Sequence, residues 1–249
     1  MVTGLVGLLA AALLAVPAVP ELPTGTDVDY QLGGATAAPA HVGIVVRDRE
    51  EKPQSGRFNI CYVNGFQTQP HQKAFWLKRK SLVLQDRTGE LVEDEAWGEW
   101  LLDLRTKPKR AKIARIVTRW TKGCASKGFD AVEYDNLDSY TRSRGLVKRR
   151  HALAFARLLT RGAHRHGLAA GQKNLAGFDG REVGFDFAVS EECGAYDECG
   201  AYVDDFGDQV LMIEYAADDF EKTCADHGDT HAVVLRDRDL APDGVRAWC

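Results

Sequence analysis

Short apolar runs alternate with helical patterns along most of this chain, and this alternation constrains the fold more than any other feature. Apolar residues recur at helical spacing in residues 110–127 and 149–166, and in the shorter segment 218–227. Eight further runs have the length and composition of buried β-strands: residues 42–47, 58–64, 100–104, 130–134, 168–172, 185–190, 210–214 and 231–235. Strands that alternate with helices are typical of parallel α/β proteins.

Eight is also the number of strands that closes an α/β barrel. An open, doubly wound sheet is the alternative, but no glycine-rich phosphate loop follows the first predicted strand. At 249 residues, 45% hydrophobic and 27% charged, the chain has the composition of an ordinary globular protein with a sizeable core. We therefore predict a single (β/α)8 TIM barrel over residues 25–249, with residues 29–33 as an extra segment before the first strand.

Residues 1–24 are predicted to be a signal peptide and a short linker. Residues 3–19 are almost wholly apolar and small, and prolines at positions 17 and 20 break the run, which is short for a membrane span. The run departs from the usual signal-peptide pattern in that no lysine or arginine precedes it. The alternative interpretation is a membrane anchor that is not cleaved. We expect a secreted monomer, held at the cell surface if the apolar segment is retained, with no stable membrane association once it is removed.

Six cysteines agree with export, because an even number in an oxidising compartment typically forms disulfides. Cys193 and Cys199 flank a short loop that one bridge could close. Cys224 and Cys249 could form a second bridge, and Cys61 and Cys124 then remain by elimination. Six cysteines allow many connectivities, so the pairing of these four stays open. No C-x-x-C spacing of a structural zinc site occurs, and we predict no metal and no other cofactor.

The basic residues indicate no nucleic-acid partner. The formal net charge is −4, and the 32 lysines and arginines are spread along the chain. Their short clusters, such as residues 78–80 and 148–150, are typical of solvated helix faces rather than of a nucleic-acid footprint.

The segment 128–140 contains the densest group of candidate catalytic side chains. Its apolar positions lead into Glu133, Asp135 and Asn136. Side chains alternate along a strand, so Glu133 and Asp135 should point to the same side. Carboxylates are costly to bury unless they are paired or hydrogen-bonded, so this cluster favours a functional site over ordinary packing. Asp138 instead suits a turn or a helix cap.

Polar groups follow the other predicted strands as well. In α/β barrels the working side chains lie at the carboxyl ends of the strands. The strand-end groups include Asp48, Asn64, Asp103, Glu133, Asp135, Asn136, Gln172, Lys173, Asn174, Glu191, Glu214 and Asp237. Tyrosines and phenylalanines lie near several of them. Carboxylates beside aromatic rings favour a sugar site, because a carboxylate pair can cleave a glycosidic bond.

Several of these segments resemble glycoside hydrolase family 114. The resemblance covers residues 29–249 and is carried by residues 60–65, 127–138, 172–174 and 213–215, and by 187–193 with Cys199. It implies a TIM barrel and endo-α-1,4-polygalactosaminidase activity on a galactosamine-containing polysaccharide. The sequence departs from the family pattern at two positions, and both concern substrate fit: Tyr134 stands where proline is common, and Glu192 where glutamine is common.

The resemblance also implies that Asp135 and Glu214 form the catalytic pair. These residues end two non-neighbouring strands and could face each other across the barrel mouth. We assign Asp135 as nucleophile or base and Glu214 as general acid/base, with Glu133 and Glu191 as the alternates.

Eight further residues are expected to bind the substrate: Asp48, Asn64, Glu133, Asn136, Lys173, Asn174, Glu191 and Tyr215. An acidic site would attract a galactosamine polymer, which is cationic where it is deacetylated. The alternative function is a catalytically inactive barrel that binds carbohydrate without cleaving it.

Overall fold

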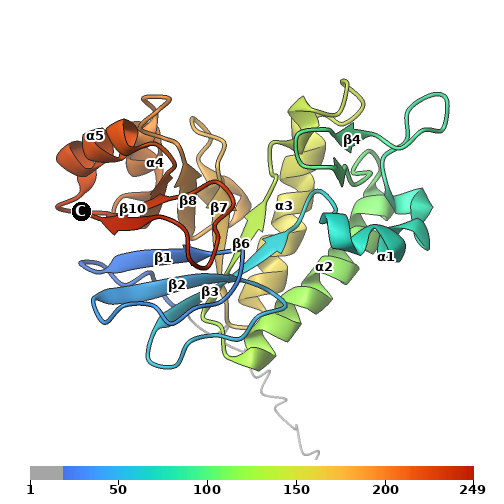
Figure 1. Ribbon diagram of the computed structural model, residues 1–249. Helices are drawn as coiled ribbons and strands as arrows, with labels where there is room; N and C mark the ends of the chain where they lie inside the picture. Colours follow the sequence, from blue (N-terminus) through green and yellow to red (C-terminus); the bar gives the residue numbers. More distant parts are fainter. Residues whose placement is uncertain (1–18) are drawn as a thin grey trace, which may run out of the picture.

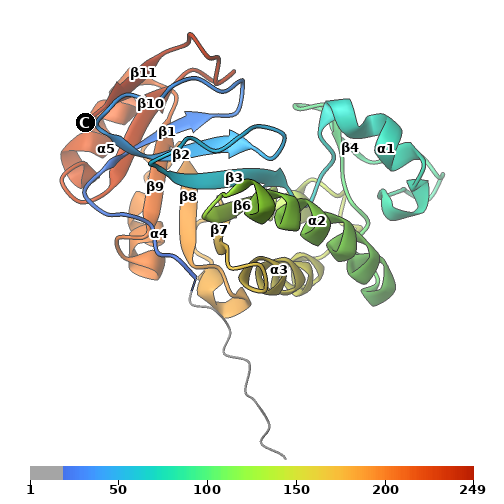
Figure 2. The same ribbon diagram turned by 90° about the horizontal axis from the view of Figure 1, so that it is seen from below.

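Nine strands form one sheet that curves into a barrel (Figures 1 and 2). The computed structural model describes residues 19–249, so most of the predicted signal peptide lies outside the described residues. Eight strands run parallel to their neighbours in this order: β1 (Asp27–Gln31), β2 (Val42–Asp48), β3 (Phe58–Asn64), β6 (Ala131–Asp135), β7 (Ala169–Lys173), β8 (Phe187–Glu191), β9 (Val210–Glu214) and β10 (Ala232–Arg236). The ninth strand, β11 (Arg246–Trp248), is antiparallel to β10. The predicted TIM barrel is confirmed.

Side chains join the two ends of the sheet. Arg236 on β10 lies 3.5 Å from the Asp29 carboxylate on β1. The indole nitrogen of Trp248 on β11 donates a hydrogen bond of 2.8 Å to the Val28 carbonyl on β1. The barrel is therefore completed by contacts between the beginning and the end of the described chain.

The predicted strand at residues 100–104 is wrong, and β1 takes its place in the barrel. Residues 99–100 form β5 (Glu99–Trp100), which pairs with β4 (Glu93–Asp94) in a separate two-stranded sheet. The leucines at 101, 102 and 104 are buried against the helices outside the barrel, which explains the apolar run. The sequence of β1 is less apolar because Asp29 and Gln31 are buried polar residues that hydrogen-bond each other at 2.6 Å.

The described part of the chain contains five α-helices: α1 (Lys73–Leu77), α2 (Lys107–Lys127), α3 (Arg149–His164), α4 (Cys199–Phe206) and α5 (Ala217–His227). The three predicted helices correspond to α2, α3 and α5. Short 3-10 helices are Pro70–Gln72, Lys80–Leu82, Ser139–Thr141 and Gly180–Val183. Gly128 ends α2 at φ +94°, a left-handed conformation that suits glycine. Within residues 19–249, no helix is long and apolar enough to cross a membrane.

Alternation along the strands separates two apolar cores. One fills the barrel interior and includes Ala131, Val189, Leu211 and Ile213. The other lies between the strands and the helices and includes Val132, Ala188, Val210 and Met212. A residue at the end of a strand lies on the same side as the residues two and four positions before it. It therefore faces the barrel mouth if those residues face the barrel interior, and the helices if they face the helices.

Three disulfides are present, including the predicted bridge between Cys193 and Cys199. The other two join Cys61 on β3 to Cys124 on α2, and Cys224 on α5 to Cys249. All six cysteines are paired in this way.

Candidate active site

A cavity of about 560 Å³ opens at the carboxyl ends of the barrel strands. Barrel strands and the residues directly after them contribute seven predicted site residues to its lining: Asp48, Asp135, Asn136, Lys173, Asn174, Glu191 and Tyr215. The long connection between β3 and α2 contributes Asp94, Trp97 and Glu99, which the sequence interpretation missed. The cavity therefore extends from the barrel mouth over the small β4–β5 sheet.

Asp135 lies at the end of β6 and reaches the cavity. Its Oδ2 accepts a hydrogen bond of 2.7 Å from the Tyr62 hydroxyl, and its Oδ1 accepts one of 2.7 Å from the Asn136 amide. Asn136 has φ +67°, so the chain turns sharply directly after the carboxylate. Two fixed donors thus hold Asp135 while the residue stays partly accessible from the cavity.

Glu191 ends β8 and is held by three donors. Its Oε1 accepts from the Tyr215 hydroxyl at 2.5 Å, and its Oε2 accepts from Lys173 Nζ and Asn174 Nδ2, each at 3.1 Å. Burial raises the pKa of Glu191, but the Lys173 ammonium and the hydrogen bonds from Tyr215 and Asn174 outweigh burial and lower the pKa overall. Glu191 is therefore ionised at neutral pH in the free protein.

Lys173 connects Glu191 to a buried layer beneath the cavity. Its Nζ donates to the Tyr30 hydroxyl at 2.8 Å and lies 3.7 Å from Glu133 Oε1. Tyr30 in turn donates to Glu133 at 2.5 Å. Burial raises the pKa of Glu133 to about 7, although Lys173 and Tyr30 oppose the shift. Glu133 is fully buried and does not line the cavity, so the structure corrects its predicted contact with substrate.

A second buried network holds Glu99. Its Oε2 accepts from Asn64 Nδ2 at 2.8 Å and from Gln67 Nε2 at 3.0 Å. Asn64 also accepts from Asn136 Nδ2 at 3.1 Å. Asn64 is buried outside the cavity lining, so it supports the site instead of contacting substrate as predicted. Burial raises the pKa of Glu99 to about 7, and nearby Asp135 raises it further, while Gln67 and Asn64 oppose the shift.

Replacement of Glu99 by glutamine should make the free energy of unfolding less dependent on pH. In the wild type the folded pKa exceeds the usual value, so this carboxyl loses its stabilising contribution as pH rises from about 4.5 to about 7. The shift corresponds to at most about 3 kcal/mol. Urea unfolding at pH 5 and pH 8 measures the difference. An equal pH dependence in Glu99→Gln and the wild type would contradict the assignment.

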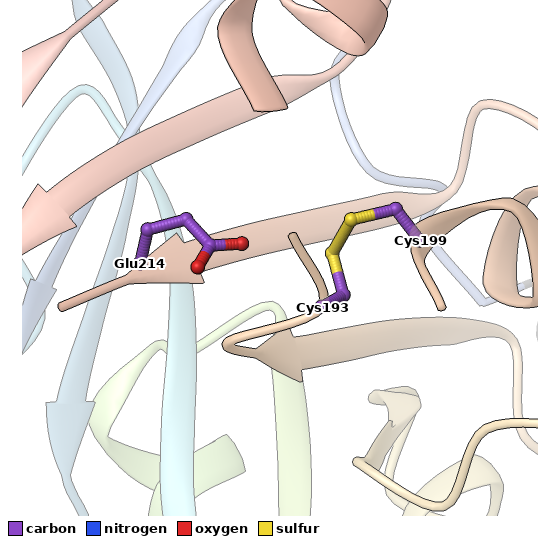
Figure 3. Close-up of side chains that lie close together, drawn as sticks. All are labelled: Cys193, Cys199 and Glu214. Carbon is purple, nitrogen blue, oxygen red and sulfur yellow. A yellow bond between two sulfur atoms is a disulfide. The ribbon is translucent and has the colours of Figure 1, made fainter. Parts of the chain in front are cut away.

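Glu214 lies apart from the cavity. The residue is fully buried, and its Oε1 accepts from the Gly194 amide at 2.8 Å and from Thr223 Oγ1 at 3.1 Å. Figure 3 shows its carboxylate at the end of β9, beside the Cys193–Cys199 disulfide. A carboxylate oxygen and both sulfurs lie within 4.8 Å of one another, but sulfurs bonded in a disulfide are not thiolate ligands for a metal.

The predicted pairing of Glu214 with Asp135 across the barrel mouth is therefore not what the structure shows. Glu214 follows the phase of Val210 and Met212, which face the helices. Glu191 follows the phase of Phe187 and Val189, which face the barrel interior. The alternation of side chains along the strands thus brings Glu191, one of the two alternates, to the cavity together with Asp135.

The sequence profile of glycoside-hydrolase family GH114 matches residues 10–249, nearly the whole chain. The chain belongs to family GH114. It is therefore a glycoside hydrolase, and a glycan is its substrate class. No curated protein sequence is significantly similar to this GH114 member.

Solved structures support the fold. The crystal structure of Aspergillus fumigatus Ega3 in complex with galactosamine has a TM-score of 0.73 and 20% identity, covering 96% of this chain and 100% of Ega3. The glycoside hydrolase domain of PelA from Pseudomonas aeruginosa has a TM-score of 0.61 and 16% identity, covering 90% of this chain and 98% of that domain. This GH114 chain is thus similar to both structures along almost its full length.

Proposed function

We propose that this protein cleaves α-1,4-linked galactosamine-containing polysaccharide, with Asp135 and Glu191 as the carboxylate pair. The observation that carries the proposal is that both carboxylates line one cavity at the barrel mouth, each fixed by its own donors. A pair of carboxylates at one glycosidic bond is what this class of hydrolysis requires. The proposal replaces Glu214 with Glu191 in the expected pair.

The charge of the cavity supports an amino-sugar polymer. Acidic groups outnumber basic groups in the lining, with Asp48, Asp94, Glu99, Asp138 and Asp239 surrounding the pair. A deacetylated galactosamine polymer carries ammonium groups, which such a cavity attracts. The structural neighbour Ega3 was crystallised with galactosamine, which agrees with this substrate class.

We assign proton transfer to and from the glycosidic oxygen to Glu191. Its pKa already reflects a balance between burial, which raises it, and Lys173 with its other donors, which lower it. A sugar ring that fills the cavity removes water and strengthens the burial effect, which favours the protonated form of Glu191. Asp135 then acts as nucleophile or base at the anomeric carbon, and Glu191 as the general acid/base.

Three disulfides support export of the enzyme to an oxidising compartment. We propose that residues 1–24 direct this export, that the mature protein spans residues 25–249, and that it acts outside the cell as a monomer.

Product analysis with purified protein tests the proposed function. A partly deacetylated α-1,4-galactosamine polymer should yield short oligosaccharides and new reducing ends. A β-1,4-linked glucosamine polymer, which carries the same ammonium groups on a sugar of different C4 configuration and linkage, serves as the control for charge alone and should stay intact. Tight binding of the galactosamine polymer without any new reducing ends would favour the inactive binding barrel instead.

A further inference from the structure

Trp97 is an exposed tryptophan at the rim of the cavity. Four large hydrophobic residues among residues 19–249 are more than half exposed: Leu77, Trp97, Tyr196 and Val245. Of these four, Trp97 alone lines the cavity, and its exposed fraction is 63%. Its place in the cavity lining, rather than its exposure alone, makes Trp97 a candidate ligand contact, because an aromatic ring offers a large rigid apolar face with a polar N–H at its edge.

The turn that carries Trp97 is held on both sides by buried, hydrogen-bonded side chains. It connects β4 to β5, and the Trp97 amide donates to the Asp94 carbonyl at 3.2 Å. The Asp94 carboxylate is buried and accepts from Arg142 Nε at 2.7 Å and from Gln67 at 3.3 Å. On the other side of the turn, Glu99 is buried in the network already described. Both ends of the turn are therefore fixed to the barrel while its tip stays exposed.

The turn that carries Trp97 lies away from the strand that carries Glu191. Figures 1 and 2 both place β4 on the α1 side of the molecule, away from β8, which carries Glu191. Asp138 and Arg142 line the cavity next to the same network as Asp94. A sugar ring lying on Trp97 would have the indole against its C–H face, while Asp138 and Arg142 supply charged groups in the same cavity.

We propose that Trp97 stacks on a sugar ring of the bound polymer at an outer subsite, distinct from the ring whose bond is cleaved. The inference rests on the proposed function and adds to it a residue that sets preference for long chains. Long polymers reach the Trp97 subsite, whereas short oligosaccharides bound at the catalytic pair do not. Trp97 thus contributes to substrate binding and takes no part in the reaction itself.

Three variants test the subsite: Trp97→Ala, Trp97→Phe and, as the matched control, Tyr196→Ala. Tyr196 is 69% exposed and does not line the cavity. Loss of one aromatic contact should raise KM for the long polymer about tenfold in Trp97→Ala, with kcat nearly unchanged. Cleavage of short oligosaccharides should not change. Trp97→Phe should recover most of the affinity, and Tyr196→Ala should match the wild type.

A wild-type KM for the long polymer in Trp97→Ala would overturn the subsite, as would an equal loss on short and long substrates. Thermal melting verifies that each variant is folded. Binding of the intact polymer, measured with Trp97→Ala in the Glu191→Gln background, separates this inference from the proposed function. If the wild type cleaves no glycan, the function fails, yet about tenfold weaker polymer binding caused by Trp97→Ala would still support the subsite.

Discussion

Glu191→Gln and Asp135→Asn should each slow polymer cleavage by at least about a hundredfold, the scale expected for a general acid/base group. Both substitutions keep the size of the side chain but remove the charge or the transferable proton. Rates of reducing-end formation at saturating polymer measure the effect. Melting temperatures should stay close to that of the wild type, because each amide can keep part of the hydrogen bonding around it.

Glu214→Gln is the matched control for this prediction. It is the same substitution at the end of the next strand, on a side chain that faces the helices. The amide oxygen can still accept from Gly194 and Thr223, and burial raises the pKa of Glu214, so a neutral group is tolerated there. Most activity should remain. A large loss in Glu214→Gln together with full activity in Glu191→Gln would restore the pairing expected from the sequence.

Lys173→Met should lower the free energy of unfolding by about 3 kcal/mol at pH 8, because it leaves Glu191 and Glu133 buried without their cation. Without the ammonium, burial dominates and the pKa of Glu191 rises. As pH falls, Glu191 and Glu133 take up protons and the cost disappears, so the variant should approach the wild type at pH 5. Urea unfolding at the two pH values measures this.

The same substitution should alter catalysis in a direction that a purely structural residue would not. The apparent pKa values in the pH–rate profile should move upward, since Glu191 holds its proton more strongly. Lys222→Met is the control, because Lys222 forms an exposed ion pair with Asp197. That variant should change neither stability nor the profile appreciably. An unshifted profile in Lys173→Met would exclude control of Glu191 by this cation.

Much of the barrel could be predicted because most of its strands are short apolar runs that end in polar groups. The two errors in the strand assignment have the same physical origin: a buried strand can contain polar residues, and a buried apolar run can lie outside the barrel. In β1, Asp29 and Gln31 are buried with polar partners and weaken the strand pattern. At residues 101–104, leucines are buried without joining the barrel.

The candidate site also contains residues that the sequence pattern could predict and residues that it could not. Asp135, Lys173 and Glu191 were predictable because they end strands in phase with interior residues. Glu214 also ends a strand, but its phase turns it toward the helices, and a count of strand ends alone does not detect this. Glu99 lies in the β3–α2 connection, and its place in the cavity depends on contacts with Asn64 and Gln67, which are distant in sequence.

The seam of the barrel has a consequence for biogenesis. The contacts that complete it join β1, near the start of the described residues, to Arg236 on β10 and to Trp248 on β11. A chain that emerges amino terminus first cannot form these contacts until residues 236 and 248 have been synthesised or exported. Until then the edge of β1 lacks these partners, which favours completion of the barrel only after the segment that contains β10 and β11 has emerged.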